Sequence, residues 1–260
     1  MVKYIRARKA DMDKAEAMLR KSIKWRAEAG ADTILRPENR PRCIREEPGF
    51  LVYDYVARLP LHVGRDYNGV PMFVSRFGMT DMAAVCKILG EERAEEAFTW
   101  ALENLRRICY DAYVESRARA RDEGRGGADA AGCIPQLNVV IDLEGFGMHC
   151  LPPLTFLKRM LGIFQDHYPE TLHRALIVRA PWAFYTAWKI ISPWLDQRIL
   201  DKINILGSGD ITEVLLQWFP ADQIPAYIGG SWIEDGDEFC SSKICPGGRI
   251  KDPKSVVVEP

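Results

Sequence analysis

The sequence predicts an α/β domain in which helices cover both faces of a parallel or mixed β-sheet. Two observations lead to this fold class. First, three short runs are apolar without the alternation of a half-exposed strand, namely residues 137–143, 175–178 and 203–206. Strands that are buried on both faces have this composition. Second, stretches with helical spacing separate these runs, and this order is typical of a sheet with parallel strands.

The first expected helix covers residues 11–29, where apolar residues such as Ala15 and Met18 recur at helical spacing. Asp11 or Asp13 can cap its start, because a short side-chain oxygen accepts hydrogen bonds from free backbone N–H groups. Gly30 can end the helix.

Turns and composition place the remaining elements. Asn68 and Gly69 favour a turn because both tolerate positive φ, and a strand is expected after them at 71–77. The other expected helices cover residues 91–121, 154–165, 182–194 and 211–219. A proline-rich connector is expected at 37–48, a loop rich in Gly and Ala at 121–133, and a polar tail after Trp232.

Length and charge are those of an ordinary globular protein. The 260 residues include 35 basic and 36 acidic side chains, and 47% are hydrophobic. This balance predicts no nucleic-acid partner, which requires a basic face. No apolar run approaches the ~20 residues of a membrane-spanning helix, and the N-terminus lacks the apolar core of a secretory signal. Seven cysteines without a CxxC pair are typical of reduced thiols, so we expect a cytoplasmic protein.

The sequence contains no strong motif for catalysis or metal binding. It has no GxxxxGK(S/T), no GxSxG and no HExxH. Asp142 and Glu144 end an expected strand, where active sites of α/β proteins often lie, but such carboxylates also cap turns or pair with cations. Cys240 and Cys245 could be metal ligands, yet no nearby histidine completes a site. We therefore predict no enzyme, no metal and no cofactor.

Aromatic residues crowd the segment 181–194. Trp182, Trp188 and Trp194 are spaced by six residues, which is about 240° around a helix, so they point to different sides. Phe184 and Tyr185 lie between them. A helix that is apolar on several sides is either fully buried or contacts something apolar on its outer face. The second case fits a lid between a lipid and a membrane, where indole rings are favoured.

Ordered motifs along the chain resemble the CRAL-TRIO lipid-binding family, in particular its phosphatidylinositol-transfer members. The resemblance runs from residue 4 to about 232. Its motifs lie at residues 4–9 (YIRARK), 25–26 (WR), 65–71 (RDYNGVP), 140–145 (VIDLEG), 165–170 (QDHYPE), 180–184 (APWAF), 202–207 (KINILG) and 215–230.

The resemblance implies a mixed, largely parallel sheet flanked by helices, with an apolar lipid pocket closed by a mobile gate helix. Residues 1–47 correspond to a small N-terminal helical part, which looks shorter than in relatives. Residues 48–232 correspond to the lipid-binding domain, and 233–260 form the tail. The gate corresponds to residues 182–195, with Trp182, Phe184, Tyr185, Trp188 and Trp194 as its pocket and membrane contacts.

The resemblance also implies a function and a headgroup site. The protein is expected to be a soluble, monomeric carrier that exchanges one phosphatidylinositol with membranes. Glu170, Lys202 and Arg8 match the residues that bind the inositol phosphate. Cations suit a phosphodiester, and a carboxylate suits inositol hydroxyls. Alternatively, Glu170 and Lys202 form a salt bridge that only supports the fold.

Two departures from the family pattern bear on the ligand. Relatives that carry phosphatidylcholine have Ser and Thr hydroxyls where this chain has Leu137 and Val139, so binding of that lipid is not expected. Ile199 replaces a threonine near Lys202. A second ligand such as tocopherol, retinaldehyde, sterol or squalene remains an alternative, as does a lipid-sensing module that recruits partners without transferring lipid.

Overall fold

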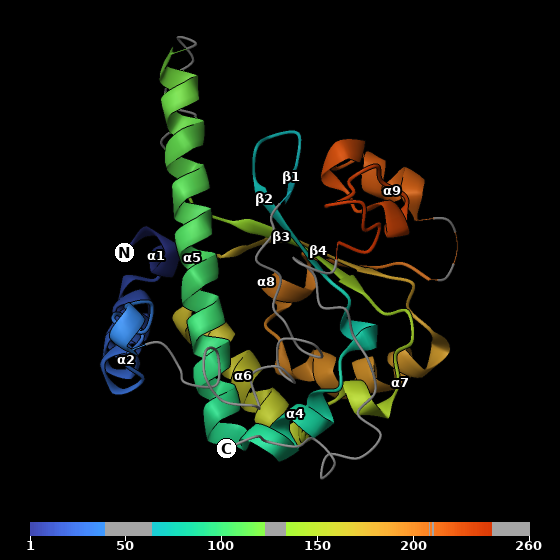
Figure 1. Ribbon diagram of the computed structural model, residues 1–260. Coiled ribbons are helices and arrows are strands. Elements are labelled where there is room, and N and C mark those ends of the chain that lie inside the picture. Colours follow the sequence, from blue (N-terminus) through green and yellow to red (C-terminus); the bar gives the residue numbers. More distant parts are fainter. Residues whose placement is uncertain (40–63, 123–133, 208, 210, 241–260) are drawn as a thin grey trace.

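The computed structural model describes residues 1–39, 64–122, 134–207, 209 and 211–240. Within them, five strands form one sheet in the order β1-β2-β3-β4-β5 (Figure 1). β1 pairs antiparallel with β2, and the other neighbours pair in parallel. This confirms the mixed, largely parallel sheet. The strands are β1 (Gly64–Arg65), β2 (Pro71–Ser75), β3 (Leu137–Asp142), β4 (Leu172–Val178) and β5 (Ile203–Ile205).

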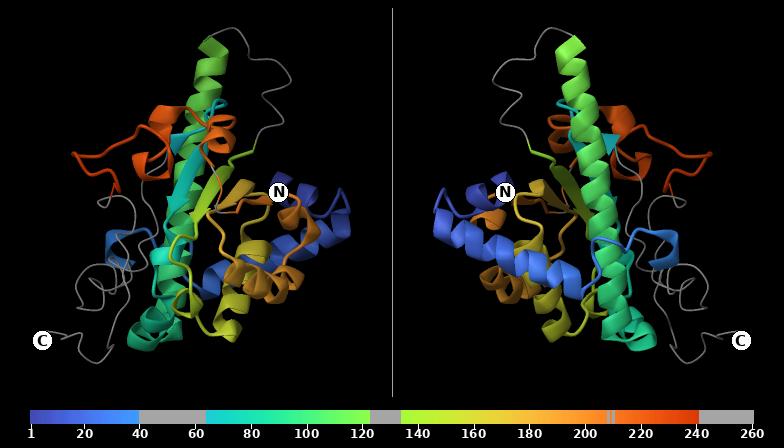
Figure 2. Two further views of the ribbon diagram at one scale, coloured as in Figure 1. Left: turned by 90° about the vertical axis from the view of Figure 1, so that its right-hand side faces the viewer. Right: turned by 90° about the vertical axis from the view of Figure 1, so that its left-hand side faces the viewer.

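Helices flank the sheet, and the 32-residue α5 runs the whole height of the molecule beside it (Figures 1 and 2). The α-helices are α1 (Val2–Ala7), α2 (Met12–Glu28), α4 (Met82–Leu89), α5 (Glu91–Asp122), α6 (Leu154–His167), α7 (Trp182–Ile191), α8 (Gln197–Leu200) and α9 (Thr212–Leu216). Short 3₁₀ turns are η1 (Pro37–Asn39), η3 (Phe77–Met79), η5 (Met148–Cys150), η6 (Ser192–Trp194), η7 (Ala221–Gln223) and η8 (Ala226–Ile228).

Local signals set most of these boundaries. Asp11 caps α2, and its carboxylate accepts a hydrogen bond from the Lys14 N–H at 3.0 Å. Gly69 adopts φ +80° in the turn before β2, which glycine allows because it has no Cβ. The helix expected at 182–194 ends as α7 at Ile191, because Pro193 has no N–H to continue the ladder, and η6 follows.

Some expected elements are shorter in the structure. The strand expected at 71–77 ends at Ser75, and η3 follows it. The strand expected at 203–206 ends at Ile205, and α9 covers only part of 211–219. Most of the expected connector, the loop and the tail beyond residue 240 lie outside the described residues.

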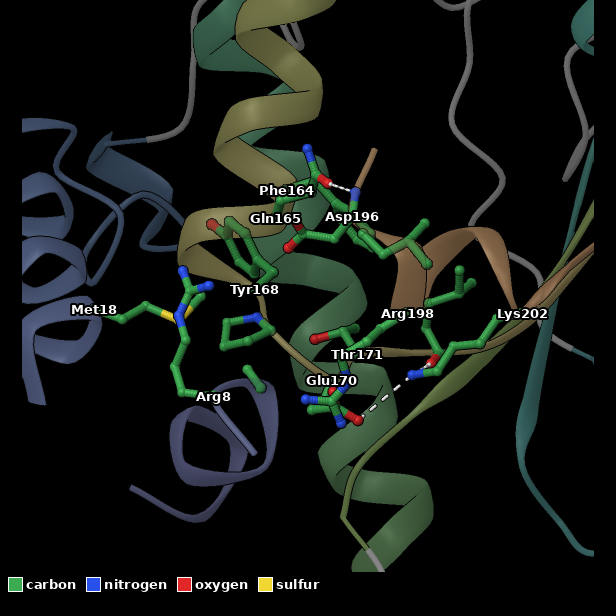
Figure 3. A pocket seen from close by; sticks show the side chains of 14 residues that line it. Arg8, Met18, Phe164, Gln165, Tyr168, Glu170, Thr171, Asp196, Arg198 and Lys202 are labelled. Atoms are coloured by element: carbon green, nitrogen blue, oxygen red, sulfur yellow. Dashed lines mark hydrogen bonds and ion pairs between the residues drawn. The ribbon is translucent and has the colours of Figure 1, made fainter. Parts of the chain in front are cut away.

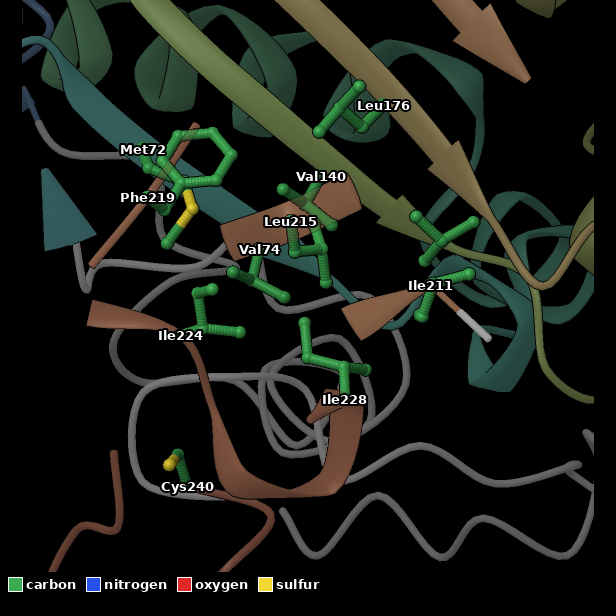
Figure 4. Packing of buried hydrophobic residues seen from close by; sticks show 11 residues of the cluster. Met72, Val74, Val140, Leu176, Ile211, Leu215, Phe219, Ile224, Ile228 and Cys240 are labelled. Carbon is green, nitrogen blue, oxygen red and sulfur yellow. The ribbon is translucent and has the colours of Figure 1, made fainter. Parts of the chain in front are cut away.

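One face of the sheet packs against α9 and the segment that follows it (Figure 4). The cluster contains Met72, Val74, Val140, Leu176, Val178, Ile211, Leu215, Phe219, Ile224, Ile228 and Cys240. Cys240 is fully buried there, so the described start of the tail packs on the domain. Among the described residues no group of His, Cys, Asp and Glu is arranged to hold a metal, and Cys245 lies outside them.

The opposite face of the sheet meets α5, α6 and α7. Its apolar side chains alternate with those of the first face along β3 and β4, as the pleat requires. No helix of the described chain is long and apolar enough to cross a membrane. The candidate site lies on this second face.

Candidate functional site

Glu170 lies in the turn between α6 and β4, at the end of the motif at residues 165–170 that resembles the CRAL-TRIO pattern. Its backbone adopts φ +56°, a conformation that places the side chain at a sharp turn. Tyr168 anchors this turn, because its hydroxyl donates to the Glu103 carboxylate at 2.7 Å in the interior. Burial, followed by the neighbouring Glu103 charge, raises the pKa of Tyr168, so the phenol keeps its proton and remains a donor.

Lys202 comes to Glu170 from the turn just before β5. Its Nζ lies 3.5 Å from Glu170 Oε2 and donates to the Leu172 carbonyl at 2.8 Å (Figure 3). Both side chains are largely covered, with 24% of Lys202 and 12% of Glu170 exposed. The structure therefore brings together two of the three residues predicted for the headgroup site, which are 32 positions apart in the chain.

Arg8 lines the same pocket from the end of α1. Figure 3 shows its side chain beside Met18, on the opposite side of Glu170 from Lys202. Within the described residues, no acidic side chain pairs with the Arg8 guanidinium.

Arg198 is a fourth charged residue of this pocket, and the sequence reasoning missed it. Its Nη2 lies 3.0 Å from Glu170 Oε1, and its Nη1 donates to the Arg6 carbonyl. It lies in α8, four residues before Lys202, and no local sequence pattern pointed to its contact with Glu170. Glu170 is thus shared by two cations.

Gln165 fixes the chain where α7 and η6 return to the site. Its amide nitrogen donates to the Trp194 carbonyl at 3.0 Å, and its amide oxygen accepts from the Asp196 N–H at 2.7 Å (Figure 3). The sequence motif contained Gln165 but gave it no role. These contacts tie the chain after α7 to α6.

The cavity within the pocket holds about 40 Å³, which is room for a few water molecules. A larger headgroup therefore has to displace the Arg198 and Lys202 side chains from Glu170. A ligand phosphate and hydroxyls could replace these contacts, because the same donors and acceptor would remain paired.

A path of packed apolar side chains joins this polar pocket to α7. Leu137, Val139, Phe164, Ile199 and Ile203 pack in one cluster with Leu172, Ala175 and Cys109. Ile203 also belongs to the next cluster, which contains Phe184 and Trp188 of α7. The charged residues of the pocket thus lie next to two apolar clusters that share Ile203.

Helix α7 presents three different faces. Phe184 and Trp188 pack on the sheet and stack on each other, with ring centroids 5.8 Å apart. Trp182 and Tyr185 face solvent and are 83% and 42% exposed. Trp194 lies in η6, half-buried, with the Lys158 ammonium 5.8 Å from its ring centroid.

The third face of α7 lines an apolar cavity of about 660 Å³. Ala183, Ala187 and Ile190 form this side of it. The opposite side is the segment from Phe146 to Leu154, which lies beside α7 (Figure 1). This volume is within the range of small-molecule binding pockets.

Comparisons with known proteins agree with this architecture. The family model described as the CRAL/TRIO domain matches residues 61–230. The chain belongs to the CRAL/TRIO family. Membership of this family supports binding of a lipid here.

Several curated relatives cover most of the chain. The CRAL-TRIO domain-containing protein T23G5.2 of Caenorhabditis elegans is 30% identical over 90% of this chain, which spans 30% of that protein. The Sec14 cytosolic factor of Schizosaccharomyces pombe is 27% identical over 95% of this chain and 76% of its own length. The crystal structure of Sfh5 superimposes with a TM-score of 0.53 at 16% identity, covering 80% of this chain and 66% of that one. This last likeness shows the fold alone.

Proposed function

We propose that the protein is a cytoplasmic carrier that binds one phosphatidylinositol and exchanges it with membranes. The observation that carries the proposal is the position of the charged pocket at the end of the apolar path. Arg8, Arg198 and Lys202 would pair with the phosphodiester, and Glu170 would accept hydrogen bonds from inositol hydroxyls. The acyl chains would lie beneath α7, on the sheet face that contains Ile203.

The energetics require exchange at a membrane. Moving two acyl chains of ~16 methylenes each out of water is worth roughly 25 kcal/mol, at ~0.8 kcal/mol for each CH₂. A lipid therefore avoids this cost only if it passes directly from the bilayer to the protein, without entering water. This passage requires α7 to move away from the sheet, and the Gln165 contacts with Trp194 and Asp196 define where the moving segment ends.

Changing Glu170 and Lys202 to Ala together tests the headgroup assignment. We expect the double variant to lose transfer of labelled phosphatidylinositol between vesicles while its circular dichroism spectrum is retained. The matched control changes Glu16 and Arg20 to Ala, an exposed ion pair on α2 with a 2.6 Å contact. Unaltered transfer by the Glu170 and Lys202 variant would mean that this pair only supports the fold.

A second ligand without a phosphate is the alternative, and the apolar surroundings of Leu137 favour it. Leu137 is 2% exposed and packs against Leu172, while Val139 lies beside it. Neither side chain can donate a hydrogen bond to a choline-lipid phosphate. A sterol, tocopherol, retinaldehyde or squalene needs no such donor. Mass spectrometry of lipids extracted from the purified protein distinguishes these ligands.

A further inference from the structure

Large apolar side chains are exposed on both sides of the 660 Å³ cavity. Met148 in η5 is 81% exposed and Leu154 at the start of α6 is 47% exposed. Across the cavity, Trp182 and Ile190 of α7 are 83% and 48% exposed. Met148, Leu154 and Ile190 line the cavity, and Trp182 precedes Ala183, which also lines it. We call these four residues the portal surface.

The segments that carry the portal surface contain no carboxylate. The chain has 36 acidic residues in 260, yet none lies between Glu144 and Asp166 or between Glu170 and Asp196. Lys158 and Lys189 occur in these segments, and neither forms an ion pair with a described residue. Lys189 is exposed on α7, about two turns from Trp182 and on the same side of the helix.

The exposed apolar side chains and the absence of carboxylates distinguish between a protein partner and a membrane. An exposed patch of this kind marks a protein or membrane contact. The interface of a bilayer favours indole rings next to lysines, and the surface of anionic lipids repels carboxylates. An apolar patch that opens directly onto an apolar cavity is also where a lipid could pass without meeting water.

We propose that the portal surface docks on an anionic phospholipid bilayer, with Met148 and Trp182 inserted on the two sides of the cavity entrance. The 146–154 segment is thus a second docking element beside the gate helix. The inference rests on the proposed lipid exchange, and it adds the residues and the lipid charge that direct docking.

Vesicle flotation tests the proposal with single changes and with folding checked by circular dichroism. We expect Met148→Ser and Trp182→Ser each to weaken binding to phosphatidylcholine vesicles containing phosphatidylserine about tenfold, because each removes one inserted side chain. Ile23→Ser is the matched control, since Ile23 is 58% exposed on α2, on the opposite side of the molecule from α7 (Figure 1). It should bind as the unchanged protein does.

Charge is tested with vesicles that contain or lack phosphatidylserine. Lys189→Gln should weaken binding only to the anionic vesicles, whereas Lys24→Gln, on α2, should leave both unchanged. Unchanged vesicle binding by both Met148→Ser and Trp182→Ser would overturn the proposal. So would a dimer in light scattering that Met148→Ser converts to a monomer, because the surface would then serve a second copy.

Lipid content separates this inference from the proposed function. Extraction and mass spectrometry of the same samples should find the bound lipid unchanged in Met148→Ser while docking is weakened. If the unchanged protein carries no lipid, the carrier function fails even where vesicle binding depends on Met148. If lipid is bound but docking is independent of Met148 and Trp182, only the docking surface is wrong.

Discussion

Replacing Glu103 by Gln is expected to destabilise the protein strongly, although Glu103 lies in the middle of a charged helix. Its side chain is 1% exposed. Its carboxylate accepts from Arg26 Nη1 at 2.7 Å, from Arg106 at 2.8 Å and from the Tyr168 hydroxyl at 2.7 Å. It therefore joins α2 and α5 to the turn that carries Glu170.

The expected loss follows from the burial of each partner. Arg26 is 14% exposed, and losing a charge-assisted bond to a buried carboxylate costs ~1.5–3 kcal/mol. Arg106 is 53% exposed, so its pair contributes less than ~1 kcal/mol. Tyr168 can still donate to the amide oxygen of Gln. Because Arg26 keeps Asp32 at 2.6 Å, we expect ~2–3 kcal/mol rather than the ~3–5 kcal/mol of a fully broken buried pair.

Urea unfolding at neutral pH measures this difference, with Glu115→Gln as the control. Glu115 lies on the same helix and pairs with Arg65 at 2.8 Å, but its side chain is 52% exposed. The control should lose less than ~1 kcal/mol. If Glu103→Gln loses no more stability than Glu115→Gln, the reasoning about the buried network is refuted.

Three further predictions concern one or two residues each. Burial lowers the pKa of Lys3 to about 8. Lys3→Met should therefore raise the unfolding free energy by up to ~3 kcal/mol below pH 8, and this gain should shrink as the pH rises towards 10.5. Urea unfolding at several pH values measures the gain. Gly78→Ala should cost ~3 kcal/mol in the same assay, since its Cβ would lie 2.1 Å from the Glu144 carbonyl oxygen. Changing Leu137 to Ser and Val139 to Thr should raise the bound phosphatidylcholine in lipid extracts.

The sign of the Lys3 effect follows from its charged form. Below pH 8 the ammonium is charged in both the folded and the unfolded protein, and the folded state bears the full cost of burying it. Above pH 8 the folded protein releases the proton first, so the cost decreases and vanishes near the ordinary lysine pKa of 10.5. A gain that grows with pH would contradict this assignment. An unaltered unfolding curve for Gly78→Ala would contradict the second prediction. An unaltered lipid content after the changes at Leu137 and Val139 would contradict the third.

Local sequence patterns were sufficient for much of the fold. The apolar runs at β3, β4 and β5 and the Asp11 cap of α2 were predictable, because each depends on neighbouring residues. The contact between Glu170 and Lys202 was expected from the resemblance to a family, and the structure places the two together. Periodicity alone could not supply a contact across 32 positions.

Long-range polar contacts were beyond the sequence patterns. Arg198 reads as a surface residue of a four-residue helix, and only the packing of α8 against α1 brings it to Glu170 and the Arg6 carbonyl. Glu103 reads as a solvent-facing residue of α5, yet tertiary packing buries it. The exposure of Met148 likewise depends on where η5 lies relative to α7.

Native mass spectrometry of the purified protein, loaded from vesicles of mixed phospholipids, tests the central claim most directly. We expect one phosphatidylinositol for each chain, and we expect it to be absent after Glu170 and Lys202 are both changed to Ala. Retention of phosphatidylinositol by the double variant, or a different lipid or no lipid in the unchanged protein, would contradict the assignment of this pocket as an inositol-lipid headgroup site.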